Sequence, residues 1–164
     1  RRRQRQMCIR DSALSAAVLS QAMRSREIHR TYQAFALGET AASGTIDAPI
    51  ARLDGSLIQR TVDFASGERS VTHYRTLAHC SVFSHLELNL ETGRTHQIRV
   101  HMAYIGHPIL GDTVYGAKKA VPGLTGQCLH AVGLQFIHPR TKELVSLTCG
   151  LPDEFTAMLR KIDR

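Results

Sequence analysis

The sequence predicts an α+β fold in which a mainly antiparallel mixed sheet is flanked by helices. Several runs of β-branched and aromatic residues are bounded by Gly or Ser, which is typical of strands. Other segments carry apolar residues at helical spacing. The chain has 164 residues, of which 43% are hydrophobic, and this is enough for one domain with a buried core.

The first half of the chain is predicted to contain one helix and four strands. Ser12 can cap a helix that runs to about Ser25, with an apolar stripe made by Leu14, Ala17, Val18 and Ala22. Strands are predicted around 29–37, 58–65, 69–77 and 82–90. In the last of these, residues 85–90 (HLELNL) alternate between polar and apolar, as expected of a strand with one buried face.

The second half begins with a predicted helix from about Thr95 to Ile105. Ile98, Met102 and Ile105 share the face that should be buried, and Gly106 with Pro108 supplies the stop signal. Two strands, about 128–137 and 143–149, and a final helix over 153–163 complete the single predicted unit.

Charge and composition favour an RNA partner. The formal net charge is +7, which suits a polyanion. Residues 1–12 (RRRQRQMCIRDS) hold five arginines and one aspartate, and without them the net charge is +3. This segment is predicted to be a non-native or disordered basic terminus, with a basic RNA-binding arm as the alternative. No apolar run suits a membrane span or a signal peptide, so a cytoplasmic location is expected.

The cysteines and histidines do not predict a metal site. Cys8, Cys80, Cys128 and Cys149 form no C-x-x-C pair and are expected to be buried or incidental thiols in a reducing compartment. Among the nine histidines, His96 and His101 lack H-E-x-x-H spacing, so no metal is expected.

The densest group of polar residues lies in the segment 92–116 (TGRTHQIRVHMAYIGHPILGDTVYG). Arg99 lies off the apolar face of the predicted helix, and a guanidinium held there suits a carboxylate or a phosphate. Arg94, at the turn into the helix, could contact phosphate. His96 and His101 are either RNA contacts or hydrogen-bonded structural histidines.

This segment resembles the C-terminal motif of the RluA/RluD-type RNA pseudouridine synthases. The family pattern T-G-R-x-H-Q-I-R-x-H, followed by G-x-P-x-x-G-D and Y-G, is matched from Thr92 to Gly116. Further matches follow the family order, with 30–32 for K-x-Y, 44–52 for G-x-I-x-x-P-I-x-R, 71–74 for the T-H-Y segment and 129–131 for L-H-A. The resemblance implies that residues 13–164 are the C-terminal portion of the catalytic domain.

The resemblance also implies a reaction and a set of roles. The family isomerises uridine to pseudouridine in RNA, here ribosomal or transfer RNA, and needs no cofactor. Two catalytic roles are implied: Tyr32 would lie against the flipped uracil and Arg99 would hold the catalytic aspartate as an anion. Leu129 would form part of the apolar pocket wall. RNA contacts are expected from Arg94, His96, Gln97 and His101.

One family motif is not found in this sequence. The family nucleophile lies in H-R-L-D-x-x-T-S-G, upstream of the tyrosine motif, whereas the only R-L-D here is residues 52–54, after Tyr32. Asp54-Gly55 is more simply a turn, and Asp112 matches a structural position of the family. The chain alone is therefore expected to be inactive, with Arg99 lacking an internal counter-charge and the sheet exposing an edge. The alternatives are a non-catalytic RNA-binding protein derived from a synthase and, disfavoured by histidine spacing, a metal-dependent hydrolase.

Overall fold

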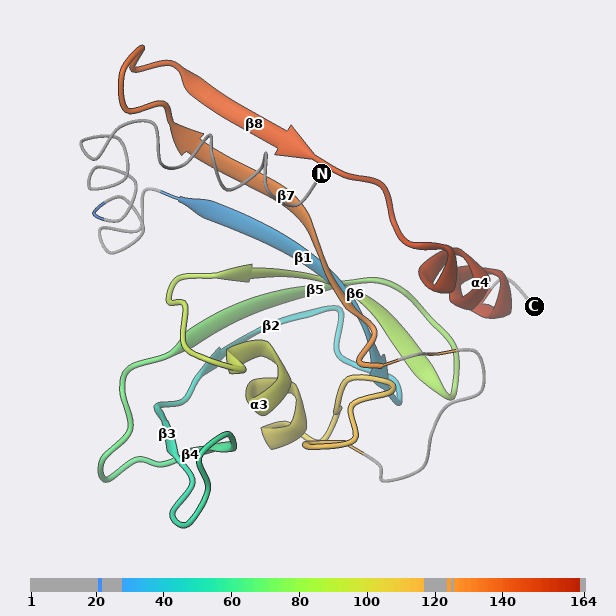
Figure 1. Ribbon diagram of the computed structural model, residues 1–164. Coiled ribbons are helices and arrows are strands. Elements are labelled where there is room, and N and C mark those ends of the chain that lie inside the picture. The colour runs from blue at the N-terminus through green and yellow to red at the C-terminus, as the bar shows by residue number, and fades with distance from the viewer. Residues whose placement is uncertain (1–20, 22–27, 117–123, 125, 163–164) are drawn as a thin grey trace.

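A six-stranded antiparallel sheet with the order β2-β5-β6-β1-β7-β8 forms the centre of the protein (Figure 1). The computed structural model describes residues 21, 28–116, 124 and 126–162. The strands of this sheet are β1 (His29–Leu37), β2 (Ser43–Asp47), β5 (Val71–His79), β6 (Phe83–Leu90), β7 (Leu129–Ile137) and β8 (Leu144–Thr148). A separate two-stranded sheet pairs β3 (Ile50–Arg52) with β4 (Arg60–Val62), and the helices are α3 (Gln97–Tyr104) and α4 (Asp153–Ile162).

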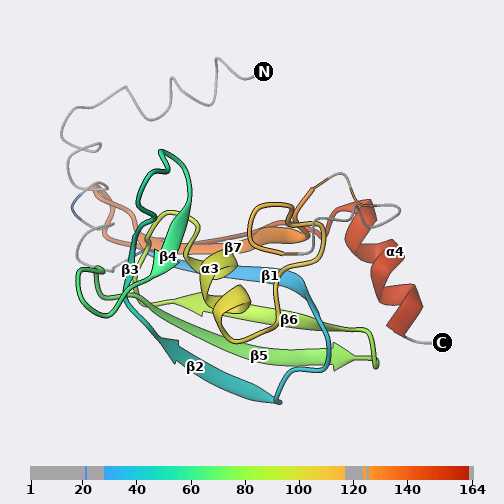
Figure 2. The same cartoon turned by 90° about the horizontal axis from the view of Figure 1, so that it is seen from below.

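The two faces of the sheet carry two separate cores. Successive side chains of a strand point to opposite faces, so Ala34 and Ala36 of β1 join one core and Phe35 joins the other. The first core contains Leu86, Leu88, Ile98 and Met102 and covers the face against α3. The second contains Phe83, Cys128, Phe155 and Met158 and lies against α4. Figures 1 and 2 show α3 beside the β3–β4 hairpin and α4 at a different end of the sheet.

Most predicted elements agree with the structure to within two residues at either end. The α+β class, β1, β5, β6, β7, β8, α3 and α4 are confirmed. The predicted strand over 58–65 is wrong in extent, because only Arg60–Val62 is extended and it belongs to the small sheet. Strands β2 and β3 were not predicted. The expected basic terminus over 1–12 and the helix from Ser12 lie outside the described residues.

Strands β2 and β8 are the two edges of the sheet as described. Leu144 and Leu147 of the edge strand β8 are 65% and 53% exposed. Exposed apolar residues on an unpaired edge favour association with another strand. The described cysteines, Cys80, Cys128 and Cys149, are free thiols, and only Cys128 is buried. No helix in the described ranges has the length and apolar character needed to cross a membrane.

Candidate active site

The segment from β6 to Gly116 folds around α3, and both helix ends are formed by backbone geometry. His96 precedes the helix in the left-handed region, at φ 59°, and makes no side-chain cap. At the other end Gly106 has φ 84°, its N–H donates to Ala103, and His107 N–H donates to Met102. This pair of bonds is a Schellman motif, so the stop signal predicted at Gly106 is confirmed.

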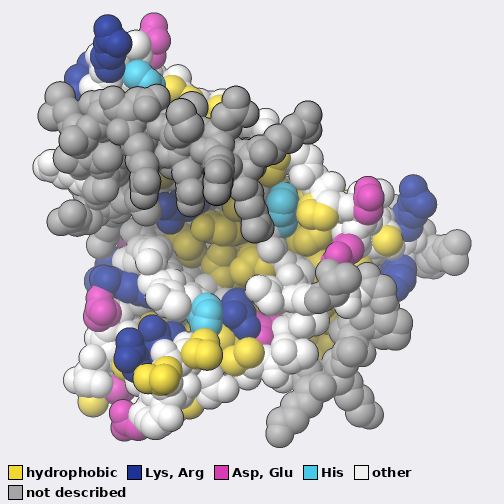
Figure 3. Space-filling model, viewed as in Figure 1, with side chains coloured by type: hydrophobic (Ala, Val, Ile, Leu, Met, Phe, Trp, Pro, Cys, Tyr) yellow, Lys and Arg dark blue, Asp and Glu magenta, His cyan; other side chains and the backbone are white. Residues whose placement is uncertain are grey.

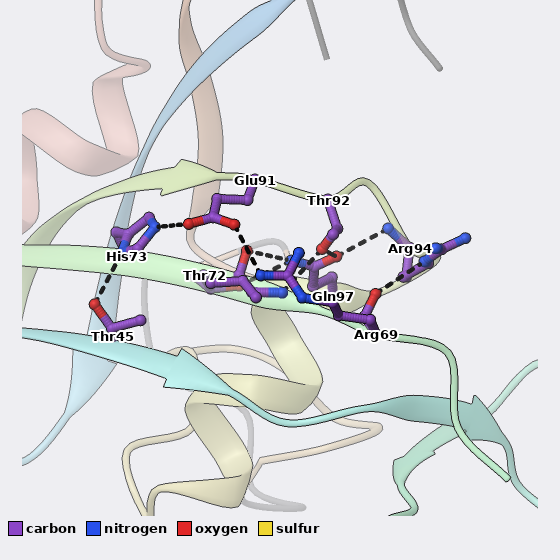
Figure 4. Close-up of polar contacts among 9 residues, drawn as sticks. Thr45, Arg69, Thr72, His73, Glu91, Thr92, Arg94 and Gln97 are labelled. Carbon is purple, nitrogen blue, oxygen red and sulfur yellow. Dashed lines mark hydrogen bonds and ion pairs between the residues drawn. The ribbon is translucent and has the colours of Figure 1, made fainter. Parts of the chain in front are cut away.

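Gln97 joins the start of α3 to strand β5. Its side-chain oxygen accepts hydrogen bonds from the Thr92 hydroxyl (2.8 Å) and from Arg94 N–H (2.9 Å). Its amide nitrogen donates to the Val71 carbonyl (2.9 Å) and the Thr72 hydroxyl (3.0 Å). Figure 4 shows Gln97 close to Thr72 of β5 and to the turn after β6, which carries Thr92 and Arg94. The turn that begins the candidate motif is therefore fixed from inside the protein.

His101 is a fully buried neutral histidine. Its Nε2–H donates to the Ala48 carbonyl at 2.8 Å, and Nδ1 lies 2.9 Å from the Thr72 hydroxyl. Burial lowers the pKa of this imidazole, against a smaller opposing effect of the bond to Ala48. Since a neutral ring with Nε2 protonated has only Nδ1 as acceptor, Thr72 donates to it.

The expected direct RNA contacts of Gln97 and His101 need correction. Gln97 is 2% exposed and His101 is 0% exposed, and their polar atoms are all bonded within the protein. Of the two alternatives left open for His101, the structure supports the hydrogen-bonded structural histidine. Both residues position the motif rather than present a surface to a ligand.

Arg99 forms a two-pronged ion pair with Asp112. Nε lies 2.7 Å from Oδ2 and Nη2 lies 2.8 Å from Oδ1. The Arg99 side chain is 12% exposed and that of Asp112 is 0% exposed. Burial alone would raise the pKa of Asp112, but bonds from Arg99 and from the N–H groups of Tyr115 and Val114 hold it below its usual value. The bond to Asp112 raises the pKa of Arg99, against the opposing effect of burial.

The expectation that Arg99 lacks an internal counter-charge is therefore wrong. Asp112 lies 13 positions further along the chain, in the turn that ends at Gly116. The fork uses Nε and Nη2, so the N–H groups of Nη1 remain outside it. Arg99 is thus held in one orientation by a carboxylate on one side and can present Nη1 to a second acceptor.

Two glycines allow the Asp112 turn to form. Gly111 has φ 74°, and a Cβ there would collide with the backbone carbonyl oxygen of Gly126. A Cβ at Gly116 would lie 2.6 Å from the carbonyl oxygen of Asp112. Both positions accept only glycine without movement of the backbone, which gives the G-D and Y-G parts of the motif a steric cause.

Tyr115 connects Arg99 and His96 to the β3–β4 hairpin. Its ring lies under the Arg99 guanidinium, 4.9 Å from Cζ to the ring centroid. Its hydroxyl lies 2.8 Å from His96 Nδ1 and accepts the N–H of Arg60 at 2.9 Å. Burial and the nearby charges of Arg99 and Arg60 lower the pKa of His96. This role of Tyr115 was not predicted, although the match of Tyr115-Gly116 to the family's Y-G had marked the residue.

Tyr32 and Leu129 lie on the sheet face that α3 covers. Tyr32 pairs with Ala131 and Ala34 pairs with Leu129 across β1 and β7, so all four side chains share a face. Tyr32 and Leu129 both pack, partly buried, against the core that contains Ile98 of α3. Arg94 instead is exposed at the turn, where Nη1 pairs with Glu68. Gln97 and His101 are thus internal residues of α3, Arg94 lies at the turn before this helix, and Tyr32 and Leu129 lie on the sheet face under it.

Asp54 does not belong to this group. Asp54 and Gly55 form an exposed turn between β3 and β4, and Gly55 has φ 75°. The R-L-D of residues 52–54 therefore runs from the end of β3 into this turn, and the turn predicted at Asp54-Gly55 is confirmed. Across the described ranges, no set of three or more His, Cys, Asp or Glu side chains could hold a metal ion.

Comparison with solved structures defines the class of fold. The chain superposes on human RNA pseudouridylate synthase domain containing 4 with a TM-score of 0.75, 24% identity, and coverage of 93% of this chain and 69% of that one. The match to human RNA pseudouridylate synthase domain containing 1 has a TM-score of 0.72 and 22% identity, covering 93% of this chain and 73% of that one. The fold is that of a pseudouridylate synthase domain.

The sequence itself establishes the family. Residues 7–104 match the RNA pseudouridylate synthase family. The chain is 42% identical over 154 residues to ribosomal large subunit pseudouridine synthase D of Vibrio parahaemolyticus, covering 85% of this chain and 46% of that protein. It is 39% identical over 155 residues to the uncharacterized RNA pseudouridine synthase YjbO of Bacillus subtilis, covering 94% of this chain and 54% of that protein. The chain belongs to the RNA pseudouridylate synthases, of the RluA/RluD type, and spans about half the length of these relatives.

Proposed function

We propose that this chain forms the Arg99 side of a pseudouridine synthase active site that acts on ribosomal RNA. The observation that carries the proposal is the Arg99–Asp112 fork, since it fixes a guanidinium next to the face that holds Tyr32 and Leu129. The choice of ribosomal RNA rests on the name of the Vibrio relative. A uridine in structured RNA must leave its stack to reach such a pocket, and the Tyr32 ring would offset part of that cost.

The reaction requires a carboxylate that the 164 residues do not supply in a recognisable motif. In the proposed site the family aspartate, from a preceding segment, accepts a hydrogen bond from Nη1 of Arg99. The bond keeps that carboxylate ionised so that it can act on the ribose as the glycosidic bond breaks. The base then turns and rejoins the sugar through a ring carbon, which loses its proton to solvent, while the ring nitrogen that left the sugar takes up a proton.

A chimaera tests this proposal. The N-terminal half of the Vibrio relative, up to the start of the aligned region, is joined to this chain at the residue where that alignment begins, and tritium release is measured from ribosomal RNA made with uridine tritiated on the carbon that forms the new bond. The chain alone should release no tritium, and the chimaera should turn over. Arg99→Gln in the chimaera should lower the rate by at least about 100-fold. A folded chimaera that releases none, beside an active relative, contradicts the proposal.

The alternative function is RNA binding without catalysis. Arg99 already has its carboxylate partner within the chain, and an internally paired guanidinium is compatible with RNA binding without catalysis. This function predicts that the chimaera binds ribosomal RNA and releases no tritium.

A further inference from the structure

An arginine-lined cleft lies beside the candidate active site, between the β3–β4 hairpin and the turn 93–95. Its volume is about 530 Å³. Arg52, Arg60 and Arg94 line it, and Glu68 is the single acidic residue in the lining. Figure 3 shows dark blue side chains gathered over the hairpin, with yellow ones beside them. The charge of the lining therefore favours an anion.

Two of these arginines face each other in the hairpin. Arg52 pairs directly with Arg60 in the register of β3 and β4. Like charges at directly opposed positions destabilise a strand pair. Neither forms an ion pair with a carboxylate of the described chain, and Arg60 uses Nη1 on the carbonyls of Ile58 and Gln59. An anion bound between them would remove the repulsion.

The third arginine has a partner that a phosphate could replace. Nη1 of Arg94 pairs with the Glu68 carboxylate, and the two side chains are 41% and 68% exposed. An exposed pair of this kind contributes little to stability. The Glu68 carboxylate lies where a phosphate bound to Arg94 would lie. Replacing the carboxylate by a phosphate would therefore cost little stability.

The hairpin also carries apolar side chains in water. Leu57 is 85% exposed, Ile58 is 68% exposed and Phe64, just beyond β4, is 70% exposed. Aromatic side chains near arginines are the combination used to bind single-stranded nucleic acid, where bases stack on rings and phosphates meet cations, and Phe64 is the aromatic residue of this group. Phosphate groups alone would not explain the three apolar residues.

The cleft is tied to the candidate active site by one hydrogen bond and one contact between a guanidinium and an aromatic ring. Arg60 donates its backbone N–H to the Tyr115 hydroxyl at 2.9 Å, and the Tyr115 ring lies under the Arg99 guanidinium. A strand of RNA that reaches Arg99 therefore has its backbone within reach of the cleft.

We propose that the β3–β4 hairpin is an RNA-binding arm. Arg52 and Arg60 bind one backbone phosphate between them, and Arg94 binds a neighbouring phosphate after release from Glu68. Leu57, Ile58 and Phe64 contact unstacked bases next to the modified uridine. The proposal rests on the proposed function, because it assumes that the ligand of the site is RNA.

Binding of a fluorescent oligouridylate of about 20 nucleotides to the full chain tests the arm, measured by anisotropy over a range of salt. The double variant Arg52→Gln/Arg60→Gln should bind about tenfold more weakly and lower the salt slope by about 0.7, the value for one lost phosphate contact. The matched control is Arg140→Gln/Lys142→Gln, which removes the same charge from the β7–β8 turn and should change affinity by less than about twofold. Thermal melting should show the arginine double variant folded, because it removes a repulsion.

Two further variants separate the parts of the arm. Glu68→Gln should tighten binding by about two- to threefold, whereas its control Glu143→Gln, on the β7–β8 turn, should not. Phe64→Ala should weaken binding of oligouridylate and leave binding of inorganic polyphosphate unchanged, because polyphosphate has no bases.

The proposal is overturned if the wild-type chain binds oligouridylate and both double variants weaken it equally. In that case binding is a general effect of charge, and the tritium-release test of the chimaera is unaffected. If Phe64→Ala weakens polyphosphate as much as oligouridylate, the base contacts are wrong.

Discussion

The two faces of the central sheet are stabilised by different chemistry. The face under α3 buries Gln97, His101, Asp112 and Thr72, all hydrogen-bonded within the protein. The face under α4 buries an aromatic cluster, in which Phe35 lies 5.2 Å from Phe155 and 5.6 Å from Phe83 between ring centroids.

The buried polar groups of the α3 face and the aromatic rings of the α4 face have different effects on the structure. Buried polar groups cost free energy unless they are fully paired, and they then fix a single arrangement. Aromatic packing stabilises the fold and is tolerant of small shifts. The α3 face therefore adds to its apolar core a paired polar network that holds the candidate site in one geometry, whereas the α4 face is packed mainly by aromatic and apolar side chains.

The largest expected effect is on the α3 face. Asp112→Ala leaves the Arg99 guanidinium buried without a partner and removes the acceptor of the Val114 and Tyr115 N–H groups. The free energy of unfolding should fall by about 4 kcal/mol, measured by urea denaturation. The double variant Arg99→Met/Asp112→Leu removes both charges and should lose much less. A loss below about 1 kcal/mol for Asp112→Ala would mean that the ion pair is not buried in solution.

A slightly smaller effect is expected on the α4 face. Phe155 is 3% exposed and packs on Phe35, so Phe155→Ala should lower the free energy of unfolding by about 3 kcal/mol. Affinity for oligouridylate, measured where the variant is folded, should not change. An RNA-binding defect in the folded variant would show that the two faces are not independent.

The smallest expected effect is a pH dependence that belongs to the α3 face. Because the pKa of His101 is lowered by burial, the unfolded chain binds the proton first as pH falls. Stability should therefore decline as pH falls below about 6.5, the usual pKa of a histidine side chain. His101→Gln should flatten this decline and His29→Gln, at an exposed histidine, should not. An unchanged profile for His101→Gln assigns the effect to His85 or His96, whose pKa values are also lowered by burial.

Long periodic segments were predictable from the sequence, and short ones were not. Strand β6 alternates over residues 85–90 and a glycine stop signal at Gly106 follows α3, so both were found within two residues. Strand β2 has five residues, of which only Ile46 is buried, and it becomes a strand by pairing with β5. Pairing between distant segments is not visible in a local pattern.

The candidate site was also predictable only in part. The motif identified Arg99, but its partner Asp112 depends on a turn that folds back through the left-handed Gly111. Similarly, the pattern marked His101 and Gln97 as polar residues on a helix, and only the packing of β5 against α3 shows that they are internal. The sequence therefore predicted which residues form the candidate site, but it did not predict whether their side chains point into the protein or toward a ligand.

The buried thiol of Cys128 can be used to measure opening of the α4-face cluster. Its thiol is 2% exposed in the α4-face cluster, and burial raises its pKa to about 12. At pH 8 only about one thiol in ten thousand would be ionised, and alkylating reagents attack the thiolate. Cys128 can therefore be labelled only during moments when the cluster opens, whereas the exposed Cys149 is always accessible. The rate of its labelling measures how often this cluster opens, by local or by global unfolding.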